Sequence, residues 1–450
     1  MPRLPHSLLL RAHKKSTLLP LVLQGTRDLP SAINELRWLT EHVQSPSPPL
    51  CPRAFRKRLL HLCERRSRAE PLQYILGSQP FGELDIKCRP GVLIPRPETE
   101  AYTTHLAELL INGSLDEQLC LPFRRTLPGR GRWKAPSPRN GLSILDVCSG
   151  SGCISLLLHS LLSKSNKFPN IKTLGLDISP KAVALADENL AFNINRGHLP
   201  AFPRSKEQDE ELKQALQGKI PGYKRRSHLK GHKLLQYLKK QKVKDERVLG
   251  IDPTAPIQFR EHDIFTSLLR PLGDFNIIIS NPPYISRSSF LSTTSHSVQK
   301  YEPRLALVPE ATYSPGSERW IQRYMNWKAR RKGDAELAED ADIFYRQLLR
   351  IYDRSSSSVL LMEVGDQEQA IRVTKLVVLR KDIGKTNRVE IWRDFPAQEA
   401  QPGEEQEVEV EGRVIPVNGA GKMRSVVLFR VEEEKMEVGR ENRATRDSGI

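Results

Sequence analysis

Three short apolar runs in the middle of the chain each lead into a loop of polar or glycine residues. They cover residues 142–147, 171–176 and 275–279, and helical patterns alternate with them. Short continuous apolar runs are typical of parallel strands that are buried on both faces. Their alternation with helices predicts an α/β fold with a doubly wound sheet, in which ligands bind at the carboxyl ends of the strands.

The loop after the first predicted strand is rich in glycine and serine, and a helical pattern begins directly after it. Glycine lets the backbone turn tightly and approach a ligand beside the N–H groups that start the helix. A dinucleotide-binding turn would have a third glycine where this chain has Ser155, which disfavours a nicotinamide cofactor. A purely structural turn is the alternative for this loop taken alone. The residues expected to bind a cofactor here are Asp146, Cys148, Ser149, Gly150, Ser151 and Gly152.

Two further carboxylates follow predicted strands. Asp177 comes just before Ser179 and Pro180, which suit the cap and the first position of a helix. A carboxylate at this edge can accept hydrogen bonds from both ribose hydroxyls of an adenosine ligand. Asp263 follows the next strand and could accept a hydrogen bond from the adenine amino group. An acidic loop residue that faces solvent is the alternative for each of them.

The third apolar run continues into the tetrapeptide Asn281, Pro282, Pro283 and Tyr284. Two prolines fix two φ angles and remove two backbone donors, so the Pro282 carbonyl is free to accept a hydrogen bond from a ligand. The Asn281 amide oxygen is a second acceptor, and the Tyr284 ring offers a stacking face. Together they predict a clamp for a planar N–H₂ group, which aligns its lone pair for methyl transfer without a strong base. An ordinary strand-ending turn is the alternative.

Several motifs together resemble the HemK/PrmC family of protein-glutamine N5-methyltransferases. The tetrapeptide at 281–284 also occurs in nucleic-acid adenine methyltransferases, but the segment LIPRPETE at 93–100 accompanies it in this family. The resemblance spans about residues 30 to 395, with gaps. The other segments that carry it are EPLQYILG at 70–77, the loop at 146–153, YEPRLAL at 301–307 and LLMEVG at 360–365.

The resemblance implies a Rossmann-like domain that binds S-adenosylmethionine (AdoMet), joined by a β-hairpin to an N-terminal helical domain. It also implies that the glutamine of a Gly-Gly-Gln motif in a peptide chain release factor enters the clamp. In the family, the positions that match 148–152 and Asp177 bind AdoMet, and Asn281 lies close to the cofactor. The chain departs from the family at Cys148, where glycine is usual, so this position must tolerate a small side chain.

Residue patterns and the resemblance together predict the domain boundaries. Helical spacing of apolar residues from Ala32 to Leu76 is interrupted by a proline-rich break at 45–49. Residues 425–429 are expected to form a last strand of the sheet. We expect a possible transit segment at 1–28, a helical substrate-recognition domain at 29–76, a hairpin linker at 77–100, an AdoMet-dependent methyltransferase domain at 101–430 with insertions near 121–140 and 200–248, and a flexible tail at 431–450.

The first 28 residues resemble a mitochondrial transit segment. No carboxylate precedes Asp28, and basic residues punctuate leucine-rich sequence at Arg3, Arg11, Lys14 and Lys15. The same leucines could instead form the first helices of the helical domain. If the segment is a transit peptide, the protein works in the mitochondrial matrix and the mitochondrial release factor is the favoured substrate.

The formal net charge of +17 favours an anionic partner such as RNA or a ribosomal surface, and basic chains are also common in the mitochondrial matrix. A ribosome or RNA contact through the basic insertion near 200–248 is one possibility. No apolar run reaches the roughly 20 residues of a membrane span, so no membrane contact is expected. The six cysteines contain no C-x-x-C pair, so neither a metal site nor a disulfide framework is indicated.

Two other functions stay open on the sequence alone. An RNA or DNA adenine N6-methyltransferase would use the same chemistry on a planar nitrogen, with the base flipped out of a duplex onto Tyr284. A non-catalytic RNA- or ribosome-binding factor could have kept the fold. Label from AdoMet in protein that resists nuclease would favour the glutamine methyltransferase over the adenine enzyme, and absence of AdoMet binding would favour the non-catalytic factor.

Overall fold

The computed structural model describes residues 3–45, 50–120, 141–200, 255–265, 275–309, 340–384 and 386–431. The two expected insertions and the expected tail lie almost wholly outside these residues. Among the described helices, none is both long and apolar enough to cross a membrane.

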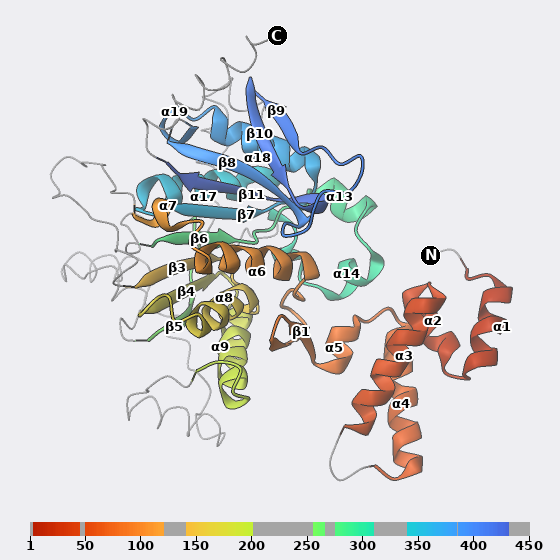
Figure 1. Ribbon diagram of the computed structural model, residues 1–450. Coiled ribbons are helices and arrows are strands. Elements are labelled where there is room, and N and C mark those ends of the chain that lie inside the picture. Colours follow the sequence, from red (N-terminus) through yellow and green to blue (C-terminus); the bar gives the residue numbers. More distant parts are fainter. Residues whose placement is uncertain are drawn as a thin grey trace, which may run out of the picture.

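The N-terminal part of the chain forms a small helical domain that stands beside the main body of the molecule (Figure 1). Its core contains residues from every one of its long helices, with Leu23, Leu39 and Cys63 fully buried. Not every apolar residue of the helical pattern is buried, because Ile33 and Leu60 are 38% and 39% exposed. The helices are α1 (His6–Lys15), α2 (Leu19–Thr26), α3 (Leu29–Gln44), α4 (Pro52–Ser67) and α5 (Leu72–Leu76).

Residues 6–26, which fall within the expected transit segment, form α1 and α2 in this domain. Ala12, Leu19 and Val22 are buried in the same core as the residues of α3 and α4. Most leucines of this segment therefore pack in or against the core, although Leu10 is 49% exposed, and the described helical domain begins before residue 29. The transit segment at 1–28 stays a prediction. Its removal on import would take both helices away from the domain.

A β-hairpin follows the helical domain. It consists of β1 (Ser78–Phe81) and β2 (Leu84–Lys87), which pair in antiparallel fashion. Hydrogen bonds across the domains come from Tyr74, whose hydroxyl donates to the Val92 carbonyl at 2.7 Å, and from Ser297, which donates to the Ala69 carbonyl at 2.7 Å. The hairpin expected at 77–100 is present over 78–87.

The main body is a nine-stranded sheet within the described residues, with the order β5-β4-β3-β6-β7-β11-β8-β10-β9. Strands β5, β4, β3, β6 and β7 run parallel to one another, as the apolar runs predicted. The fold is α/β and Rossmann-like, which confirms the expected class. The strands are β3 (Leu142–Val147), β4 (Ile171–Asp177), β5 (Ile257–Glu261), β6 (Ile277–Ser280), β7 (Val359–Glu363), β8 (Asn387–Phe395), β9 (Glu407–Val410), β10 (Arg413–Asn418) and β11 (Ala420–Arg430).

The last strand, β11, lies inside the sheet. It pairs in antiparallel fashion with β7 on one side and with β8 on the other. The expected strand at 425–429 is therefore confirmed as the core of β11. Strands β8, β9 and β10 were not predicted.

Helices cover both faces of the sheet (Figure 1), and alternate strand residues point to opposite faces. Ile277 and Ile279 of β6 pack toward α6, α8 and α9, whereas Ile278 packs toward α17 and α18. The helices of this domain are α6 (Pro97–Ile111), α7 (Asp116–Cys120), α8 (Cys153–Lys164), α9 (Pro180–Asn195), α13 (Arg287–Ser292), α14 (His296–Tyr301), α17 (Ile343–Arg354), α18 (Gln367–Val378) and α19 (Lys381–Gly384).

Candidate active site

Strand register places the candidate residues at one edge of the sheet. Val147 pairs with Leu176 of β4 and with Ser280 of β6, and Ser280 pairs with Met362 of β7. The residues that directly follow these four paired positions therefore lie side by side at one edge of the sheet. These next residues are Cys148, Asp177, Asn281 and Glu363.

A cavity of about 970 Å³, which includes space open to solvent, lies at this edge. Its lining comes from the carboxyl ends of the parallel strands, from the segment 91–96 after the hairpin and from α6. Most of the predicted site residues line it together, although they are up to 135 residues apart in the chain. Those that do are Cys148, Ser149, Gly150, Ser151, Asp177, Asp263, Asn281 and Pro283.

The glycine loop is held open toward the cavity. Gly150 has a φ of 55°, and a Cβ added to it would meet no atom within 4 Å. Gly152 has a φ of 78°, and a Cβ there would lie 2.7 Å from the Phe259 ring. Gly150 therefore leaves room for a ligand to approach the backbone. Gly152 instead lets the loop pack against the sheet at the start of α8.

Cys148 adopts a left-handed backbone conformation, with a φ of 63°. Glycine takes this conformation without strain, whereas a residue with a Cβ pays roughly 1–2 kcal/mol. The family's usual glycine therefore has a physical reason at this position, and cysteine is tolerated as a small, unbranched side chain. Burial raises the pKa of the Cys148 thiol, which keeps it neutral beside the acidic residues of the cavity.

We expect Cys148→Val to lower the free energy of unfolding by about 2 kcal/mol, because a β-branched side chain is poorly accommodated at positive φ. Cys148→Gly is the matched control and should change it by less than about 1 kcal/mol, since relief of strain offsets the lost side-chain contacts. Urea unfolding of both variants measures the difference. Equal losses in the two variants would show that backbone strain does not govern this position.

Asp177 lies in the cavity wall and also holds two loops in place. Its Oδ2 accepts a hydrogen bond from the Gly150 N–H and its Oδ1 accepts one from the Ser179 N–H, both at 2.8 Å. Burial raises the pKa of this carboxyl, and these two backbone donors oppose the rise. An ionised carboxylate accepts about four hydrogen bonds, so Asp177 keeps acceptor capacity for a ribose hydroxyl. As predicted, Ser179 caps α9, where its side chain accepts a hydrogen bond from the Ala182 N–H.

Asp146 lies beneath the glycine loop and not in the cavity wall. It is fully buried, and its Oδ2 accepts a hydrogen bond from the Ser155 hydroxyl at 2.6 Å. Within the described residues its Oδ1 has no hydrogen-bond partner. Burial raises the pKa of Asp146 to about 7, and the nearby Asp177 carboxylate adds to the rise. Its placement suits a residue that supports the loop.

Two residues after β5 line the cavity, and one of them, His262, was not predicted as a site residue. Asp263 lines the cavity, and its Oδ1 accepts a hydrogen bond from the Phe265 N–H at 2.9 Å. The neighbouring His262 also lines the cavity, and its Nε2 is buried without a hydrogen-bond partner among the described residues. Burial lowers the pKa of His262, which favours the neutral ring. Phe265 and Phe344 give this side of the cavity an apolar wall.

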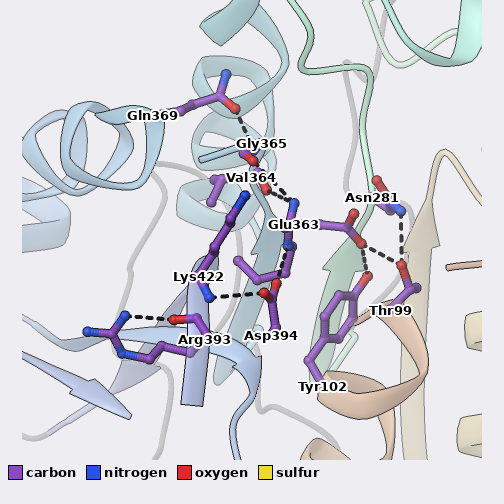
Figure 2. A network of polar contacts seen from close by, with 12 residues as sticks. Thr99, Tyr102, Asn281, Glu363, Val364, Gly365, Gln369, Arg393, Asp394 and Lys422 are labelled. Carbon is purple, nitrogen blue, oxygen red and sulfur yellow. Dashed lines mark hydrogen bonds and ion pairs between the residues drawn. The ribbon is translucent and has the colours of Figure 1, made fainter. Parts of the chain in front are cut away.

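The tetrapeptide at 281–284 turns away from the sheet at the cavity edge. Asn281 and Pro283 line the cavity, and the Asn281 Nδ2 donates to the Thr99 hydroxyl at 3.4 Å (Figure 2). Pro282 and Tyr284 are not among the lining residues. The Tyr284 hydroxyl donates to Glu363 at 3.1 Å, and its carbonyl accepts from Gln369. These contacts with Glu363 and Gln369 fix the position of Tyr284.

An ion pair joins two of the family-like segments at the mouth of the cavity. The Arg96 guanidinium donates to the Glu302 carboxylate at 2.6 Å, and Glu302 is 6% exposed. The other oxygen of Glu302 accepts from the Ile94 N–H. Burial opposes the charge of Arg96, but Glu302 prevails and raises the pKa of this side chain. The segment 91–96, which sequence reasoning left without a role, is therefore fixed as one wall of the cavity.

The residues of this cavity fit AdoMet. Open space beside Gly150 admits a ligand close to the backbone, Asp177 offers acceptors to a ribose, and His262 and Asp263 offer polar groups beside apolar side chains. The acidic residues also suit a ligand that carries positive charge. Among the described residues, no group of three or more His, Cys, Asp or Glu side chains could hold a metal ion.

Two yeast proteins match most of the chain. The mitochondrial MRF1 N5-glutamine methyltransferase MTQ1 of Saccharomyces cerevisiae is 32% identical over 310 residues, which are 69% of this chain and 69% of that protein. The probable MRF1 mitochondrial N5-glutamine methyltransferase of Schizosaccharomyces pombe is 30% identical over 308 residues, 68% of this chain and 73% of that protein. A bacterial release factor glutamine methyltransferase, from Thermodesulfovibrio yellowstonii, is 38% identical over 132 residues, 29% of this chain and 37% of that protein.

Family models and solved structures do not narrow the family further. No family model matches the chain. Among solved structures, the hMettl16 catalytic domain in complex with an RNA hairpin aligns with a TM-score of 0.35 at 10% identity, and covers 82% of each chain.

The fold and the cavity define an AdoMet-dependent methyltransferase. The two fungal relatives, each at least 30% identical and covered over more than two thirds of its length, narrow the class. The chain belongs to the family of release factor glutamine N5-methyltransferases, as the sequence motifs predicted.

Proposed function

We propose that this enzyme methylates the side-chain nitrogen of the Gly-Gly-Gln glutamine in a peptide chain release factor, and thereby supports translation termination. The observation that carries the proposal is the position of Asn281 in the cavity wall, one strand away from the glycine loop and two strands away from Asp177. The fungal and bacterial relatives, whose names give a release factor or its glutamine as their target, support the same substrate.

The tetrapeptide supplies the chemistry that the chain itself must provide. AdoMet, when bound, supplies an electrophilic methyl group. The Asn281 Oδ1 and the Pro282 carbonyl accept hydrogen bonds from the two N–H bonds of the glutamine amide, and Pro283 forms part of the wall beside it. As the nitrogen–carbon bond forms and the carbon–sulfur bond breaks, these oxygens stabilise the positive charge that grows on nitrogen. One proton then leaves the nitrogen for water.

The cofactor is proposed to lie along the loop of Cys148, Ser149, Gly150, Ser151 and Gly152. Asp177 would hold its ribose and Asp263 its adenine, while Asp146 supports the loop from below. Asn281 would lie between this site and the glutamine, so it contacts both. Tyr284, whose hydroxyl is held by Glu363, would fix the position of the clamp.

Asp177→Ala should raise the Kd of AdoMet about 10- to 100-fold, because it removes charge-assisted hydrogen bonds to the ribose. At saturating AdoMet, kcat should stay within about threefold of wild type, since Asp177 does not face the transferred group. Isothermal titration calorimetry gives the Kd. Asp177→Asn keeps the shape and one acceptor, and an intermediate loss is expected. An unchanged Kd for the alanine variant would remove Asp177 from the cofactor site.

The substrate is tested by direct transfer. Purified protein is incubated with labelled AdoMet and, separately, with a mitochondrial release factor, its Gly-Gly-Gln→Gly-Gly-Ala variant and total RNA, and the label is mapped by mass spectrometry. Label on the glutamine that is lost in the variant is the expected result. Label on adenine alone would overturn the proposal in favour of the nucleic-acid methyltransferase.

The compartment is proposed to be the mitochondrion, and within it the matrix, where a mitochondrial release factor would be methylated. The fungal relatives are named as mitochondrial enzymes, and the basic, leucine-rich start of the chain supports the same compartment. We further propose the helical domain as the part that recognises the release factor, and the basic insertion near 200–248 as a contact to the ribosome or RNA. The insertion lies almost wholly outside the described residues.

A further inference from the structure

A buried carboxylate lies directly behind the clamp and has no part in the transfer described above. Glu363 ends β7 and is 1% exposed. Its Oε2 accepts hydrogen bonds from the hydroxyls of Thr99 at 2.7 Å and Tyr102 at 2.8 Å, and its Oε1 accepts one from Tyr284 at 3.1 Å. Three hydroxyl donors directed at one carboxyl group match its ionised form, which only accepts hydrogen bonds.

The direction of these hydrogen bonds determines what Thr99 can offer on its other side. A hydroxyl group has one hydrogen, and the Thr99 hydrogen is donated to Glu363. The Thr99 oxygen can therefore only accept from Asn281, whose Nδ2 lies 3.4 Å away. Figure 2 shows the resulting chain from Glu363 through Thr99 to Asn281. Thr99 lies in the first turn of α6, is 2% exposed and contributes to the cavity lining.

An asparagine amide presents opposite groups on its two sides. When its N–H₂ side is turned toward Thr99, its oxygen is turned away from Thr99, as Figure 2 shows. An oxygen in the cavity accepts from a substrate N–H₂ group and repels a carboxylate. An amide turned the other way would present N–H₂ to the substrate, which would repel an amide nitrogen and attract a carboxylate.

We infer that Thr99 is a positioning residue that, held by Glu363, orients the Asn281 amide so that the site accepts a side-chain amide and rejects a carboxylate. This inference rests on the proposed function, because it assigns the means by which the clamp selects its substrate. Thr99, Asn281 and Glu363 lie in three of the family-like segments, 93–100, 281–284 and 360–365, and this hydrogen-bond chain joins them.

The decisive variant is Thr99→Val, which keeps the shape of the side chain and removes the oxygen. Without an acceptor at Thr99, the Asn281 amide is free to turn, and we expect kcat for the release factor to fall about 10- to 100-fold. The Kd of AdoMet should stay within about threefold, because the cofactor loop is untouched. Thr99→Ser keeps the hydroxyl and should restore kcat to within about threefold of wild type.

Tyr102→Phe is the matched control. The Tyr102 hydroxyl donates to the same Glu363 oxygen as Thr99 does, but it has no hydrogen bond to Asn281. The variant should therefore keep kcat within about threefold of wild type. If Tyr102→Phe lowers kcat as much as Thr99→Val does, the carboxylate serves only the packing of the network, and the inference is wrong.

Substrate selection gives a readout that a purely structural role would not move. A release factor with Gly-Gly-Glu in place of Gly-Gly-Gln serves as a competitive inhibitor, and its inhibition constant is compared with the KM for the glutamine substrate. In Thr99→Val the ratio of the two should shift at least about tenfold toward the glutamate form, because the turned amide donates to a carboxylate. An equal weakening of both would overturn the inference.

Three further outcomes are distinguishable. If Thr99→Val fails to bind AdoMet, Thr99→Ala replaces it, since a smaller side chain removes the oxygen without overpacking, and the same shift in the ratio is expected. If the wild-type enzyme does not methylate the release factor, the proposed function fails. A wild-type enzyme that is active, with a Thr99→Val variant of equal kcat and unchanged ratio, contradicts the inference alone.

Discussion

Asn281→Ala should lower kcat for the release factor about 100- to 1000-fold, the loss typical of one preorganised group that stabilises transition-state charge. The side chain lines the cavity. In the proposed mechanism its amide oxygen is the acceptor that faces the growing charge on the substrate nitrogen. The Kd of AdoMet should change far less, because the glycine loop and Asp177 are unaffected. Single-turnover transfer of labelled methyl groups at saturating cofactor measures the loss.

The control for this variant is Asn195→Ala, which removes an exposed asparagine at the end of α9. It should transfer methyl groups at the wild-type rate. A wild-type rate for Asn281→Ala itself would show that the clamp mechanism is wrong.

Without cofactor, the free energy of unfolding of Asp146→Asn should rise relative to that of the wild type as the pH increases from 5 to 8. Burial raises the pKa of Asp146 to about 7 in the folded state, whereas its ordinary value is 3.8. Between these two pH values the unfolded chain has released a proton that the folded chain still holds, so the free energy of unfolding falls as pH rises. The total fall is about 4 kcal/mol, at about 1.4 kcal/mol per unit of pKa.

Asparagine has no carboxyl proton to lose, so the variant lacks this component of the pH dependence. Urea unfolding of both proteins from pH 5 to pH 8 gives the difference, which should grow by about 2–4 kcal/mol over this range. Glu368→Gln, which removes an exposed carboxylate on α18, is the control. A constant difference for Asp146→Asn would mean that the folded protein ionises this residue as easily as the unfolded chain does.

Sequence reasoning found the site residues that directly follow apolar strands. A parallel strand is recognised by its apolar run, and register then brings the residues that end neighbouring strands to one level. Cys148, Asp177 and Asn281 were identified in this way, and the structure places all three in one cavity. Thr99 and Arg96 were not assigned a role, because their approach depends on how α6 and the segment 91–96 pack against the sheet.

Strand β8 was missed because charged residues interrupt its sequence. The segment at 387–395 contains two arginines and two carboxylates, which suggests a loop. In the structure, Arg393 is 6% exposed and donates to the carbonyls of Gly421 and Glu405. Glu390 is 8% exposed and accepts from the Asn418 side-chain amide, 28 residues later in the chain. Partners that are distant in sequence satisfy these side chains, and no local pattern reveals them.

The central place of β11 has a consequence for the synthesis of this protein on the ribosome. Strand β7, which ends in Glu363, obtains one of its two neighbours from residues 425–429, more than 60 positions later in the chain. Until β11 is made, β7 therefore presents an unpaired edge, and β8, which pairs with β10, has no strand between it and β7. A nascent chain that stalls earlier would expose this edge and would be a substrate for chaperones.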